Sequence, residues 1–75
     1  MNKERRKELE EIAGAIMDVR MRLESVKDEE QDAFDALPEG FQRGEKGEAM
    51  EEAIQNMEDA IGQLEDAESS VQNIS

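Results

Sequence analysis

A seven-residue repeat fills the C-terminal third of the sequence and restricts what the chain can fold into. Residues 50–74 read MEEAIQN MEDAIGQ LEDAESS VQNI, in which one apolar residue recurs at every seventh position: Met50, Met57, Leu64 and Val71. Alanines at 53, 60 and 67, followed by Ile74, come three positions after them. A sustained 3-4 spacing of apolar residues is typical of a helix that packs lengthwise along another helix. The repeat therefore requires a partner helix.

The first half of the chain carries the same spacing and can supply that partner. Its apolar positions run from Leu9 to Leu37 in alternating steps of three and four, with Glu30 as the charged member. Pro38 ends this helix, because the residue before a proline is pushed out of the helical region. We predict a helix over about 2–37, a loop over 38–44 and a second helix over about 45–73. Glycines in the loop, Gly40 and Gly44, are expected to supply unusual backbone angles.

Two helices joined by a short connection pack as antiparallel neighbours. The sequence therefore predicts an all-α fold over residues 1–75, a single antiparallel two-helix hairpin that resembles a coiled coil. In the predicted register Val19 faces Leu64 and Val26 faces Met57, while Ile16 and Leu23 of the first helix face alanines. This register also places the basic residues of 3–7 beside the acidic residues of 65–68, near the negative end of the second helix.

Several apolar residues fall outside the predicted seam between the helices. Ile54 and Ile61 form a second row beside it, and the first helix adds Met17, Met21 and Phe34. A row of apolar residues at helical spacing is typical of an interface. We predict self-association through these five residues, most simply as a two-fold homodimer that forms a four-helix bundle. A foreign partner is the alternative occupant of the same surface.

Phe41 is the one aromatic residue of the predicted loop. It either caps the end of the hairpin over Leu37 and Ala33, which we favour, or contacts a partner.

The charge balance is strongly acidic. Nine Lys and Arg residues stand against 21 Asp and Glu residues, which gives a formal net charge of −12. Such a field repels nucleic acid and anionic membranes and attracts basic surfaces. We therefore expect no direct nucleic-acid or membrane binding, and a host or phage protein with a basic surface as partner. Three acidic pairs between the apolar positions would bind it: Glu51, Glu52, Glu58, Asp59, Glu65 and Asp66. The alternatives are that these pairs only confer solubility, or that they mimic DNA.

The residues that carry most enzyme chemistry are missing. The chain has no Cys, His or Thr, so an activated nucleophile with a neighbouring base is not available. An acidic cluster over 28–35 lacks the ligand spacing of a calcium-binding loop. We expect no catalytic residues, no cofactor and no metal. The N-terminus has no apolar segment typical of a secretion signal, so a cytoplasmic location is expected.

The LPEGFQ turn at 37–42 and the following GEKGEAMEEAIQNMEDAI at 44–61 resemble a group of short, acidic, uncharacterised helical proteins. That group is carried by phages and mobile elements of Gram-positive bacteria. The resemblance implies a small accessory protein that acts in a bacterial cytoplasm, and such proteins often inhibit a host factor. It implies no catalytic activity.

The function expected from the sequence is a non-enzymatic, acidic protein-interaction module, with inhibition of a host protein as one role that it could serve. One alternative is a structural or assembly homo-oligomer. The other is a protein that sequesters an anionic small molecule through Arg20, Arg22 and Arg43 at a junction between subunits.

Overall fold

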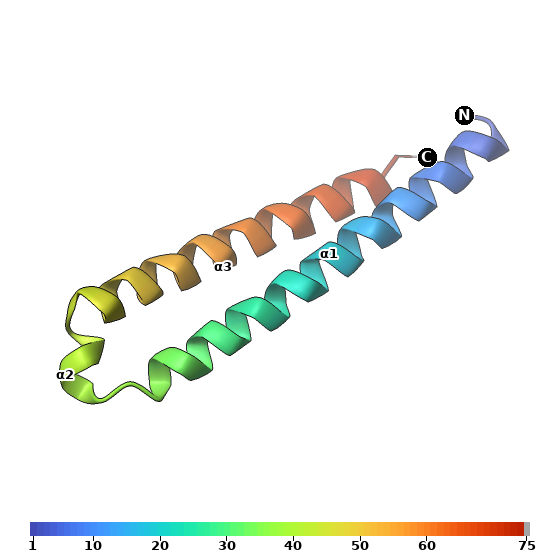
Figure 1. The fold of residues 1–75 in the computed structure, drawn as a ribbon. Coiled ribbons are helices and arrows are strands. Elements are labelled where there is room, and N and C mark those ends of the chain that lie inside the picture. The colour runs from blue at the N-terminus through green and yellow to red at the C-terminus, as the bar shows by residue number, and fades with distance from the viewer. Residues whose placement is uncertain (75) are drawn as a thin grey trace.

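The structure is a computed structural model, it describes residues 1–74, and it forms a helical hairpin (Figure 1). Its helices are α1 (Lys3–Asp35), the single turn α2 (Glu39–Gln42) and α3 (Glu45–Gln72). The long helices α1 and α3 lie side by side in opposite directions, in a rod of 59 × 14 × 11 Å (Figure 1). The predicted all-α fold with two packed long helices is confirmed, and their bounds lie within two residues of the predicted ones. None of these helices is both long and apolar enough to span a membrane.

Local signals in the sequence fix both ends of α1. The side chain of Asn2 accepts a hydrogen bond of 2.8 Å from the backbone N–H of Arg5, which satisfies one of the free donors of the first turn. At the other end Pro38 prevents continuation. The Gln42 side chain then donates a hydrogen bond of 3.0 Å to the carbonyl oxygen of Phe34, which also accepts one from the backbone N–H of Leu37 at the end of α1. The connection is thereby tied to the end of α1.

The connection between the long helices differs from the predicted loop. It contains α2, which packs against the start of α3. Within the described residues no glycine has a positive φ, so the prediction that Gly40 and Gly44 supply unusual backbone angles is wrong. The glycine that the connection requires is Gly47, which is buried in the first turn of α3. A Cβ atom built there would overlap the carbonyl oxygen of Gln42, so α2 can approach α3 only because position 47 has no side chain.

The core between α1 and α3 is centred on residues that we expected outside it. Ile54 and Ile61 are only 7% and 9% exposed, and Ala13 of α1 is buried near the other end of the hairpin, beside Glu68 and Val71. The prediction that Ile54 and Ile61 flank the seam as a self-association surface is therefore wrong. The physical reason is size, since burying an isoleucine side chain removes far more apolar area from water than burying the neighbouring alanine. Accordingly α3 turns Ile54 and Ile61 inward, and Ala67 is exposed.

Helix α1 is rotated to match. Arg20, Lys27 and Phe34 are half-buried, whereas Ile12 and Val19 are exposed. Phe34 therefore does not lie on the outer surface where we had placed it. By contrast Met17 and Met21 are exposed, as expected for residues outside the seam.

The pairing of the two helices is also shifted along their length. The predicted register places Arg20 beside position 63, but its guanidinium lies 3.3 Å from the carboxylate of Glu68, more than one helical turn further along α3. The N-terminal turns of α1 consequently extend beyond the end of α3 (Figure 1). The basic residues of 3–7 form no ion pair with α3 in the part of the chain that is described, so the predicted contact with residues 65–68 is wrong.

Candidate protein-interaction site

A row of large apolar side chains runs along the outside of α1. Ile12, Val19 and Val26 are 42%, 48% and 51% exposed, and Ala33 continues the row. These positions are seven residues apart, so they lie above one another on one side of the helix. On α3 the alanines at 53, 60 and 67 form a similar row of small residues. We call these seven residues the apolar face.

The two rows open toward the same side of the hairpin. The groove along the opposite side is lined from α1 by Glu24 and Asp28, and from α3 by Glu58, Gly62 and Glu65. On each helix these positions lie on one flank of the buried seam, and the residues of the apolar face lie on the other flank. The apolar face is therefore continuous across both helices, and the acidic groove is behind it.

Charge is segregated between these two sides. The positions that border the apolar face on α3 are all exposed and all uncharged, namely Ala49, Asn56, Gln63 and Ser70. On α1 the border is mixed, with Glu8, Arg22 and Glu29 among its residues. The three acidic pairs of α3 lie on its other sides. All six of their carboxylates are exposed, and none of the ion pairs within residues 1–74 includes them. The hairpin therefore has one largely neutral side and one strongly acidic side.

One polar contact joins the helices inside the seam. Arg20 donates hydrogen bonds to Glu24 on its own helix, at 2.9 Å, and to Glu68 on α3, at 3.3 Å. Hydrogen bonding to Glu24, with a further contribution from Glu68, raises the pKa of Arg20 above its ordinary value, while partial burial acts in the opposite direction. The side chains of Arg20 and Glu68 are only 20% and 16% exposed. This partly buried ion pair therefore marks which positions of α1 and α3 lie side by side.

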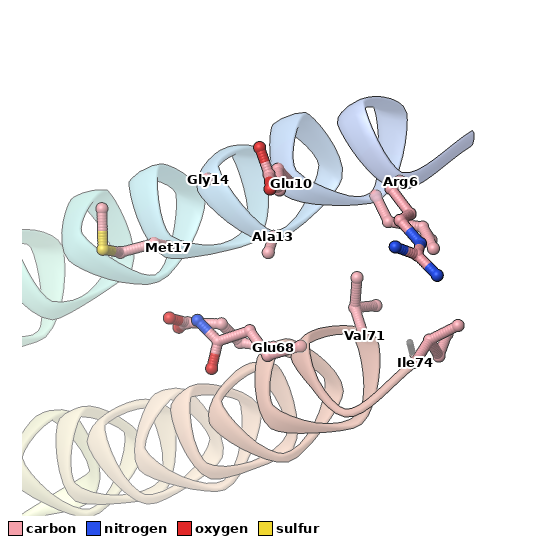
Figure 2. A pocket seen from close by; sticks show the side chains of 10 residues that line it. Arg6, Glu10, Ala13, Gly14, Met17, Glu68, Val71 and Ile74 are labelled. Atoms are coloured by element: carbon pink, nitrogen blue, oxygen red, sulfur yellow. The ribbon is translucent and has the colours of Figure 1, made fainter. Parts of the chain in front are cut away.

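The open end of the hairpin contains a groove of about 530 Å³ (Figure 2). Ala13 from α1 and Val71 from α3 point toward one another across it, and Met17 and Glu68 lie at its inner end (Figure 2). Arg6 and Ile74 line its outer end. The groove exists because the N-terminal turns of α1 extend past the end of α3, so those turns have no helix opposite them.

Within one chain the loop aromatic does not form the predicted cap, and two of the candidate arginines, Arg20 and Arg43, do not come together. Phe41 is 61% exposed, so the preferred prediction that it caps the hairpin over Leu37 and Ala33 is wrong, and a partner contact is the interpretation that remains. Arg20 pairs with Glu68 in the seam, whereas Arg43 pairs with Glu39 at 2.7 Å beside the connection. Arg20 and Arg43 are therefore held in separate places by their own carboxylates, and one chain does not assemble an anion site from them.

The apolar face was not predicted from the sequence, because Ile12, Val19 and Val26 were expected to lie in the seam between the helices. The available signal was an excess of apolar rows. Helix α3 carries three adjacent ones, at 50/57/64, 53/60/67 and 54/61, and a single partner helix can bury only two of them. The predicted binding residues of α3 are located as expected on an exposed acidic side. Comparison with protein-family models, curated proteins and solved structures gives no match, so a functional argument rests on this geometry.

Proposed function

We propose that this chain is a non-enzymatic protein-interaction module that binds through its apolar face. The observation that supports this most strongly is the exposed row of Ile12, Val19 and Val26, which the fold leaves uncovered although the hairpin core is small. Contiguous apolar rows on a small protein mark interaction surfaces more often than isolated apolar residues do.

Covering the exposed parts of Ile12, Val19 and Val26 would stabilise a complex. Each of these three side chains is about half covered within the hairpin. Complete burial of a Val or Ile side chain is worth about 1.5–3 kcal/mol, so covering the exposed half contributes about 1 kcal/mol per residue. The alanine row of α3 allows a partner backbone to come close beside it. A partner helix lying along the apolar face would gain both contributions.

A second candidate surface is the acidic side of α3, which fits a partner protein with a basic surface. It is favoured by the six exposed carboxylates that have no ion pair within residues 1–74. By occupying a basic surface the chain would act as an inhibitor, in keeping with the phage-like group that it resembles. In that role the rod imitates a polyanion without needing a catalytic group.

The two surfaces can be separated by capture experiments from a bacterial lysate. The wild-type chain and two variants serve as baits: Val19→Glu, which changes the apolar face, and Met21→Glu, which changes an equally exposed residue outside it. A partner of the apolar face is retained by wild type and Met21→Glu and lost by Val19→Glu. Capture of the same partner by all three baits would refute binding through the apolar face.

A third variant tests the acidic side. Glu58→Gln with Asp59→Asn and Glu65→Gln removes three charges without changing side-chain length. A partner with a basic surface is expected to bind this variant more weakly, and to be released from wild type as salt rises from about 0.1 M to 0.5 M, because exposed charges are then screened over a few Å. Binding that survives both changes would rule out the acidic side and, with it, imitation of DNA.

A further inference from the structure

We propose that the partner of the apolar face is a second copy of this chain, so that two hairpins pack face to face as a four-helix bundle. This inference rests on the proposed function, because it names the occupant of the same surface. It differs from the dimer expected from the sequence, since the residues that make the contact are Ile12, Val19 and Val26 with the alanines of α3, and not Ile54 and Ile61.

The first argument is the amount of exposed surface. The hairpin has an accessible surface of 5699 Å² for a chain of 8.5 kDa. A compact monomer of this mass exposes about 4,700 Å². The excess is therefore about 1,000 Å², and a standard stable interface removes about 800 Å² from each partner. One dimer contact along the apolar face accounts for the excess.

The second argument is the small core of the single hairpin. No large side chain is fully buried within the described residues, and the buried apolar side chains are Ala13, Ile54 and Ile61. The inner residues Leu9, Ile16 and Leu23 of α1, and Met57 and Leu64 of α3, are only half-buried. These residues lie between the seam and the apolar face, so a second hairpin would complete their burial. A chain of this size without disulfides needs such additional packing for stability.

The third argument is charge. A second copy carries the same net charge of −12, so its acidic side is repelled by the acidic side of the first. The apolar face and its uncharged α3 border are where two like-charged copies can approach with least repulsion. This repulsion determines how salt changes the affinity of two copies for one another. Screening weakens the repulsion between copies, so the dimer tightens as salt is added, whereas a basic partner on the acidic side is released.

The fourth argument is shape. The rows on the two helices share the seven-residue spacing, but α1 presents large branched side chains and α3 presents alanines. When α1 of one copy lies against α3 of the other, each large residue meets a small one. Facing large and small residues interdigitate without leaving voids. The apolar face is therefore complementary to itself, which a two-fold contact requires.

Sedimentation equilibrium of the full chain tests the proposal. We expect the wild type to sediment at twice its chain mass of 8.5 kDa, and to dissociate at lower concentration in about 0.5 M salt than in 0.05 M salt. Val19→Glu places a carboxylate of each copy in the apolar contact, so the dissociation constant should rise by at least about 100-fold. The matched control is Met21→Glu, which is expected to leave it unchanged. Circular dichroism of each variant checks that its helices are kept.

Three results would overturn the proposal: a monomeric wild type at all salt concentrations, an equal loss of association in both variants, or a dimer that Val19→Glu does not weaken. The proposed function fails separately. A monomeric wild type that still captures another protein through Val19 removes the second copy as the partner and leaves the apolar face as a binding site. Absence of both association and Val19-dependent capture removes both.

Discussion

The three glycines inside the long helices provide a test of the fold in which the same substitution has opposite effects. A Cβ atom at Gly14 or at Gly62 would meet nothing within 4 Å apart from the helix itself. At Gly47 it would lie 2.5 Å and 2.7 Å from the backbone C and Cα atoms of Gln42, and closer still to the carbonyl oxygen. All three residues lie within helices, so alanine raises the intrinsic helix propensity at each position.

The expected magnitudes follow from these contacts. Gly14→Ala and Gly62→Ala should each increase the free energy of unfolding by about 0.8–1 kcal/mol, the difference in helix propensity between the two residues. Gly47→Ala gains the same amount but forces the backbone of α2 away from α3. Overpacking costs about 1–3 kcal/mol, and a clash with backbone rather than with a flexible side chain belongs at the upper end or above it. The net change should be a loss of about 2 kcal/mol or more.

Urea unfolding followed by circular dichroism measures all three changes at one protein concentration. Gly14 and Gly62 lie outside the apolar face, so replacing them should not change the association of two chains. The differences in unfolding free energy then report on the hairpin itself. The account of the connection would be refuted if Gly47→Ala proved as stabilising as the other two, because α2 would then not pack against the start of α3. A destabilising Gly62→Ala would contradict the open space beside that residue.

Further substitutions test three other parts of the structure. Ile61→Ala should lower the free energy of unfolding by about 2 kcal/mol, since it removes a buried side chain. Met21→Ala should change it by less than about 0.5 kcal/mol, because that side chain is exposed. Equal effects of the two substitutions in urea unfolding would contradict a helix orientation that buries Ile61 and exposes Met21. Phe41→Ala should likewise leave stability within about 0.5 kcal/mol of wild type, because the ring is exposed. A large loss of stability would instead support the prediction that Phe41 caps the end of the hairpin. Arg20→Gln leaves Glu68 without its partner in the seam and should lower the melting temperature. Adding Glu68→Gln to this variant should recover part of the lost stability. If the two losses simply add, the two residues do not interact.

The elements of the fold were predictable because their signals are local. Pro38 ends one helix, Asn2 begins it, and the 3-4 spacing extends over several turns in both halves of the chain. These features act within a few residues of where they occur. They therefore identify the helices and their ends without knowledge of the packing.

The rotation of the helices could not be predicted in the same way. Position 53 and position 54 are adjacent on the helix, and both belong to apolar rows with seven-residue spacing. Which row faces α1 depends on the total area buried by both helices, and this is a property of the packed pair. The alanine row gave the more regular heptad, but the isoleucine row buries more apolar surface. The face left open on α1 follows from that choice.

The shift in pairing has a separate cause in the connection. The four residues of α2 are too few to show a helical period, so the sequence indicated only a loop. Once folded, α2 packs under Gly47 and sets where α3 begins relative to α1. The contact of Arg20 with Glu68 then follows, and so does the overhang of the N-terminal turns. Helix α2, which is too short for periodicity to detect, thus determines which residues of α1 and α3 lie side by side.

Thiol protection measures directly whether the apolar face becomes covered. The chain contains no cysteine, so Val19→Cys and Met21→Cys each introduce a single, similarly exposed thiol, one inside the apolar face and one outside it. The rate of reaction with a soluble thiol reagent is measured from dilute to concentrated protein. We predict that the Val19→Cys thiol becomes protected as concentration rises while the Met21→Cys thiol reacts at a constant rate. Equal rates for both thiols at every concentration would contradict the account.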